Sequence, residues 1–115
     1  MAKDFASAFE FHLESLRVKV DVMDKLGIAY SFEGLAQVSA ASGEPEQAAV
    51  LWGAASRLRE DMNVPLESSR QEMYTSLIPV TRGQFGEEAF DRARKRGNEM
   101  ALNEAIAFAL NLPET

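Results

Sequence analysis

The chain has 115 residues, the size of one small domain, and its 46% hydrophobic and 26% charged residues exclude a disordered or collagen-like chain. Twelve Lys and Arg residues against 18 Asp and Glu residues give a formal charge of −6. This charge repels phosphate backbones and anionic lipid headgroups, so we expect neither a nucleic-acid partner nor a membrane partner.

The composition favours helices, because alanine outnumbers Val, Ile and Thr together. We predict an all-α protein that forms a single domain over residues 1–115. Cysteine is absent, the N-terminal residues form no uninterrupted apolar stretch, and no apolar run approaches the roughly 18 residues of a membrane span. These features predict a cytoplasmic protein.

The first helix is indicated by apolar residues that recur every three or four positions between Asp4 and Met23, which is the period of one helix face. Asp24 is placed to act as the N-cap of a second helix, which runs to about Ser42. Each of these signals is local, because a cap and a periodic stripe involve residues close in sequence.

Gly43 and Pro45 mark the boundary between the second helix and the third. Glycine suits the left-handed position after a helix, and proline suits the first turn of the next one. A connection this short makes the two helices antiparallel neighbours. The third helix carries Trp52 on its apolar face and ends before Asn63, and we expect Trp52 to anchor the core.

The fourth helix is predicted to begin with Ser68 or Ser69 as its N-cap and to reach about Arg82. Pro79 lies inside it and is expected to kink or end it, because proline removes a backbone donor and clashes with the preceding turn.

Glycines separate the remaining predicted elements. We interpret Gly83-Gln84-Phe85-Gly86 as a turn, because it lacks the lysine and the preceding strand of a phosphate loop. Two further helices follow over 87–95 and 102–110, with Gly97-Asn98 between them.

An internal repeat becomes visible when residues 4–16 are laid on residues 44–56, an offset of 40. Ala8 then falls on Ala48, and His12 falls on Trp52. Helix-pair repeats of about 34 to 47 residues build α-solenoids, so the spacing predicts antiparallel helix-hairpin repeats with about five to six helices.

The second and third helices resemble a tetratricopeptide repeat at Phe32, Leu35, Ala36, Gly43, Ala48, Trp52 and Ala55. A more specific resemblance covers nearly the whole chain. It is to the C-terminal tetratricopeptide-type region of large bacterial regulators and signalling ATPases, which include LuxR-type transcription factors. The segments that carry it are Glu14-Ser15-Leu16, Gly27-Ile28-Ala29, Glu33-Gly34-Leu35-Ala36, Gly43-Glu44-Pro45-Glu46-Gln47-Ala48-Ala49, Trp52-Gly53-Ala54-Ala55, Leu58-Arg59-Glu60, Gly86-Glu87-Glu88-Ala89-Phe90 and Leu102-Asn103-Glu104-Ala105-Ile106.

This resemblance implies a noncatalytic helical-repeat module for protein–protein interaction or regulation, related to the C-terminal part of a bacterial transcriptional regulator. The chain carries no GxxxxGK[ST] motif, so nucleotide hydrolysis does not follow from the resemblance and no cofactor is expected. Ala101 stands where the family usually has Ser or Thr, which predicts a poorly capped last helix. The alternative function is a sensor domain that binds a small molecule or peptide in a groove between helices.

No residue pattern predicts a catalytic or metal site. His12 is the only histidine and has no cysteine partner, and we expect it to be partly buried. The acidic pairs Glu10 with Glu14 and Glu87 with Asp91 lack a histidine at ligand spacing. The basic run 92–96 spreads around a helix and complements its C-terminal dipole.

A candidate binding groove combines aromatic and polar side chains, as peptide-binding grooves do. The second helix contributes Tyr30, Glu33 and Gln37, and the fourth contributes Arg70 and Tyr74. In the alternative interpretation, the two tyrosines simply pack between neighbouring helices.

A candidate self-association face lies on the first helix, which no helix precedes in the chain. Its residues are Phe5, Phe9, Leu13 and Leu16. Phe11 and Val18 lie on its flanks. Such an apolar face needs a cover, so we expect a homodimer in which the first helix packs against its copy or against the second helix of the partner.

Overall fold

The computed structural model describes residues 4–112, apart from the side chains of Ser69 and Met73. Within this range the chain forms six α-helices and no strand, which confirms the predicted all-α class. The helices are α1 Phe5–Asp21, α2 Lys25–Ala41, α3 Pro45–Met62, α4 Ser68–Phe85, α5 Glu87–Asn98 and α6 Leu102–Leu110.

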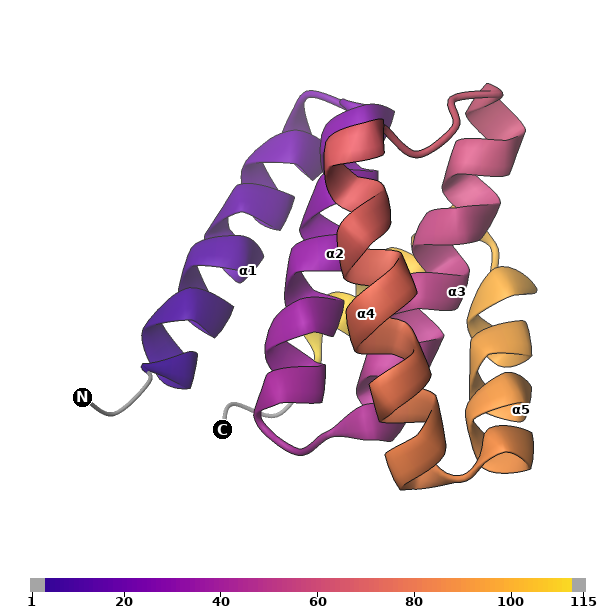
Figure 1. Cartoon of the computed structure of the whole chain (residues 1–115). Coiled ribbons are helices and arrows are strands. Elements are labelled where there is room, and N and C mark those ends of the chain that lie inside the picture. The colour runs from indigo at the N-terminus through magenta and orange to yellow at the C-terminus, as the bar shows by residue number, and fades with distance from the viewer. Residues whose placement is uncertain (1–3, 113–115) are drawn as a thin grey trace.

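Four helices lie side by side in the order α1, α2, α3 and α5, as Figure 1 shows. In that view α4 crosses in front of α2 and α3, and α6 lies behind them. The two central helices are therefore covered from several sides, and together they supply most of the buried residues.

The predicted boundaries around α2 are confirmed. The Asp24 side chain accepts a hydrogen bond from the Gly27 amide at 3.0 Å, which caps the helix. After the helix, Gly43 has a φ of 85°, a left-handed conformation that glycine adopts without strain. Pro45 then opens α3 as its first residue.

The predictions for α4 were wrong at both ends. Glu67 is its N-cap, and neither Ser68 nor Ser69 takes that position. Pro79 does not end the helix, which continues through Gly83 to Phe85. The proline costs one backbone hydrogen bond to the carbonyl of Thr75, but both residues are exposed, so water can solvate that carbonyl. The break comes at Gly86, where φ is 105°.

The prediction that Gly97-Asn98 separates the last two helices was also wrong, because both residues belong to α5. Gly97 is buried against α3, and a Cβ built on it would lie 1.9 Å from the carbonyl oxygen of Val50. Gly53 faces α5 in the same way, 2.0 Å from the carbonyl oxygen of Arg94. The two glycines let the backbones of α3 and α5 touch.

The start of α6 has a cap that the sequence did not predict. The Glu104 side chain accepts a hydrogen bond from the Ala101 amide at 2.9 Å. Alanine has no oxygen to complete a capping box, so Glu104 supplies the one side-chain bond seen at this helix start.

Trp52 lies fully buried in the core, as predicted. Its ring centroid lies 6.5 Å from that of Tyr74 on α4 and 6.2 Å from that of Phe90 on α5. The tryptophan therefore joins α4 and α5 to α3.

Candidate functional site

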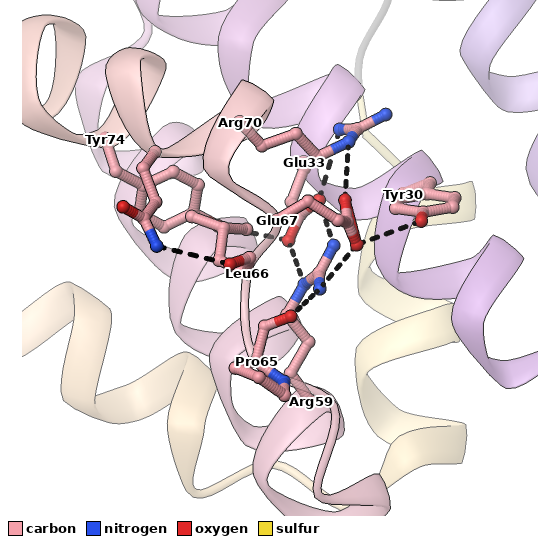
Figure 2. A network of polar contacts seen from close by, with 9 residues as sticks. Tyr30, Glu33, Arg59, Pro65, Leu66, Glu67, Arg70 and Tyr74 are labelled. Atoms are coloured by element: carbon pink, nitrogen blue, oxygen red, sulfur yellow. Dashed lines mark hydrogen bonds and ion pairs between the residues drawn. The ribbon is translucent and has the colours of Figure 1, made fainter.

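Three of the other four predicted groove residues lie around the buried carboxylate of the fifth, Glu33 on α2 (Figure 2). Its oxygens accept hydrogen bonds from Arg59 at 2.7 and 3.2 Å, from Arg70 at 3.3 Å and from the Tyr74 hydroxyl at 3.2 Å. The charge is thus compensated by two arginines and a phenol, as a charge buried at 0% exposure requires.

Arg59 on α3 is the central residue that the groove prediction missed. Besides its two bonds to Glu33, its guanidinium donates to the Pro65 carbonyl at 3.2 Å and to Glu67 at 3.4 Å. The helical period did carry a signal, since Arg59 stands seven residues after Trp52 and Glu33 four after Ala29, both buried positions. An acid and a base at such positions on adjacent helices indicate a buried pair.

Tyr30 lies at the edge of this cluster and is held by two kinds of contact. Its hydroxyl donates to Glu67 at 3.0 Å, and the Arg70 guanidinium lies 4.2 Å from its ring centroid. Cation–π contacts of this kind add attraction to a ring already used for packing. Gln37 lies one turn after Glu33 on α2, but its side chain is exposed and makes no hydrogen bond to the cluster.

The surroundings of the cluster fix the protonation states of Tyr74 and Arg59. Burial raises the pKa of Tyr74, and the neighbouring charge and hydrogen bond of Glu33 raise it further, so the phenol stays protonated and donates. Burial opposes the charge of Arg59, but the carboxylates of Glu33 and Glu67 outweigh it and raise its pKa. Figure 2 shows a closed network that pins α4 and the α3–α4 connection onto α2 and α3.

A cavity of about 430 Å³ adjoins this network. Arg59 and Tyr74 form the wall that the two features share. The rest of the lining comes from α3, the connection after it and α5, and consists of Ser56, Glu60, Asn63, Val64, Pro65, Leu66 and Arg94. One groove candidate, Tyr74, thus lies beside a real concavity.

A smaller hollow of about 210 Å³ lies on the other side of the cluster, where Tyr30, Arg70 and His12 line it. His12 is partly buried, and its ring fills the space left by Gly34 on α2, where a built Cβ would lie 2.3 Å from the imidazole. Burial lowers the pKa of His12, and the charge of Arg70 lowers it further. The described part of the chain contains no group of three His, Cys, Asp or Glu residues able to hold a metal ion.

The predicted self-association face is covered by the chain itself. Phe9, Leu13 and Leu16 are at most 3% exposed, and Phe5 is partly buried against the same core. The prediction chose the wrong side of α1, because the stripe with the stronger periodicity is the one that packs on α2. The apolar residues left exposed on α1 and its C-terminal corner are Phe11, Val18, Val22 and Met23.

In comparisons with known proteins, no family model, curated protein or solved structure matches this chain. Across residues 4–112, no helix is long and apolar enough to span a membrane.

Proposed function

We propose that this chain is a noncatalytic helical-repeat module that binds another protein and serves in regulation. The observation that carries the proposal is the exposed apolar stripe of α1. Phe11 is 68% exposed and Val18 57%, and they lie seven residues apart on one face of the helix; Val22, the C-cap residue four positions later, is 68% exposed. Large apolar side chains grouped in this way are typical of protein-binding surfaces.

A second copy of the chain is the simplest partner for this stripe. Two-fold pairing places the same apolar surface against itself and buries both copies at once. The proposal includes a cytoplasmic bacterial regulator as the biological setting, in line with the family resemblance and the absence of cysteine. The regulated pathway does not enter the proposal.

A photo-crosslinking amino acid at position 18, introduced in the native cell, tests this function. We expect a defined adduct, of twice the chain mass for a homodimer or of another discrete mass for a different protein. The same probe in place of the exposed Glu88 on α5 serves as the control and should give no adduct. If position 18 also gives none, or if Val22→Glu leaves its adduct unchanged, the α1 surface is not the binding site.

The second candidate function is a sensor that binds a small molecule, and the cavity beside Tyr74 favours it. Its volume of about 430 Å³ lies within the range of roughly 300 to 1,000 Å³ of small-molecule sites. Screening small apolar compounds by thermal melting tests this function. We expect stabilising compounds whose effect disappears in Leu66→Arg, which fills the cavity, and persists in Val80→Arg on the exposed side of α4.

A further inference from the structure

Several polar side chains that line the cavity beside Tyr74 make no hydrogen bond or ion pair within the described part of the chain. Ser56, Glu60 and Asn63 lie along the C-terminal end of α3, and Arg94 faces them from α5. Among the residues that the structure describes, none of these four side chains takes part in a hydrogen bond or an ion pair. The opposite wall differs, because Arg59 and Tyr74 already donate hydrogen bonds to Glu33.

Arg94 stands out among the arginines that are at least partly buried. Arg59 and Arg70 pair with Glu33, and Arg82 pairs with Asp91 at 2.9 Å. Arg94 makes no ion pair within contact distance in the described part of the chain, although it is half-buried and the charge of Asp91 acts on it from further away. Asp91 already pairs with Arg82, so the Arg94 guanidinium keeps free hydrogen-bond donors that an anionic ligand group could accept from.

A free anion lies next to this free cation. Glu60 and Arg94 line the cavity together, and both also line a neighbouring hollow that contains Asp91 and Glu99. Asp91 pairs with Arg82 and Glu99 with Lys95, which leaves Glu60 as the carboxylate here without an ion pair in the described part of the chain. A ligand with only a negative charge would be repelled by Glu60, and one with only a positive charge would be repelled by Arg94. A ligand that carries both charges close together satisfies both side chains.

Apart from Arg59, the remainder of the cavity has an apolar or aromatic lining. Val64, Pro65 and Leu66 of the α3–α4 connection line it, together with the ring of Tyr74. The Tyr74 hydroxyl already donates to Glu33, so this residue offers its ring to the cavity. Such a lining favours an apolar side chain on the ligand.

We propose that this cavity binds a free α-amino acid with an apolar side chain. Its carboxylate pairs with Arg94, its ammonium group pairs with Glu60, and its side chain packs against Leu66 and Tyr74. The proposal rests on the second function above, the binding of a small molecule in this cavity, and names the class of that molecule.

The test is a titration of the full chain with L-leucine, followed by the backbone amide NMR shifts of the cavity residues. Arg94→Gln and Glu60→Gln should each weaken binding by about tenfold or more, the effect of losing one hydrogen bond to a charged group. The matched controls are Arg92→Gln and Glu88→Gln, which remove the same charges from exposed positions on α5 outside the cavity lining. These should bind L-leucine as the native chain does, and all four variants should melt as the native chain does.

Two analogues assign each charge. N-acetyl-L-leucine lacks the ammonium group, so Glu60→Gln should not weaken its binding, whereas Arg94→Gln should. L-Leucinamide lacks the carboxylate and should show the reverse pattern. If instead both variants bind L-leucine normally, or uncharged apolar compounds bind as well as L-leucine does, the assignment of an amino acid is overturned while the cavity remains a binding site. If no compound of any charge shifts the cavity amides, the small-molecule function fails with it.

Discussion

Arg59 Nε lies 2.7 Å from one carboxylate oxygen of Glu33, and a second nitrogen of the same guanidinium lies 3.2 Å from the other. The two residues stand 26 positions apart, on adjacent helices, and both are buried. This bidentate salt bridge joins α2 to α3 at the point where Arg70 and Tyr74 of α4 also bond to Glu33.

The first prediction concerns the energetics of this pair. Glu33→Leu or Arg59→Met should each lower the free energy of unfolding by about 3 to 5 kcal/mol, because each leaves one buried charge without its main partner. The double variant should lose much less unfolding free energy than the two single variants together, since it removes both charges. Urea unfolding of the four proteins measures the coupling, and additive losses would show that the pair is not an energetic unit.

The second prediction concerns the backbone contact between α3 and α5. Gly53→Ala or Gly97→Ala should lower the free energy of unfolding by at least about 1 to 3 kcal/mol, because each new Cβ would meet a backbone carbonyl. Gly83→Ala is the matched control. Gly83 lies in α4 with open space around its Cβ position, so alanine should stabilise the helix by about 0.5 to 1 kcal/mol. Equal effects at the three positions would contradict the close approach.

The third prediction concerns Trp52. Its complete burial predicts a blue-shifted fluorescence spectrum that external quenchers hardly affect. Trp52→Ala should cost about 3 to 5 kcal/mol of unfolding free energy. Trp52→Phe should cost less unfolding free energy. The indole Nε1 makes no hydrogen bond, so its removal leaves no acceptor unpaired. A red-shifted, easily quenched spectrum would contradict the core position of the ring.

The fourth prediction concerns pH. In the folded chain the pKa of His12 lies below its ordinary value of 6.5, first because of burial and then because of Arg70, and Lys19 lines the same hollow. The unfolded chain therefore takes up the proton first as the pH falls, and the stability that the neutral ring contributes is lost below about pH 6.5. Denaturant unfolding between about pH 7 and about pH 5 measures this slope.

His12→Gln is the control for the pH prediction and should flatten the slope over that interval. The carboxyl groups of Asp4, Glu67 and Asp91 also have lowered pKa values, so their contributions are lost at more acidic pH, below about 4.5. A slope that persists unchanged in His12→Gln would assign the effect to other groups.

The sequence by itself determined the helical class and the sharpest boundaries. Asp24 caps α2 through the Gly27 amide, and Gly43 with Pro45 separates α2 from α3. These signals are reliable because each residue acts on backbone groups within a few positions of itself. The burial of Trp52 followed in the same way, from an apolar stripe with one very large member.

Glycines serve two structural roles in this chain, ending a helix or allowing two helices to approach closely, and only the tertiary structure tells them apart. Gly43 and Gly86 have positive φ and end helices, as a local signal implies. Gly97 continues α5 because its missing side chain admits the backbone of α3 at Val50. Sequence alone does not distinguish these cases, because the residue that requires the second glycine is far away along the chain.

The tertiary structure also decided the candidate site and the free face of α1. Two predicted groove residues, Arg70 and Tyr74, bond to a third, Glu33, but Arg59 completes the charge balance. Gln37 stays exposed, since helix packing selects which side chains become buried neighbours. On α1, Phe9 and Leu13 pack inward while Phe11 and Val18 remain exposed. A periodic stripe predicts that one face will be buried, but whether this chain or another one covers it depends on the placement of α2.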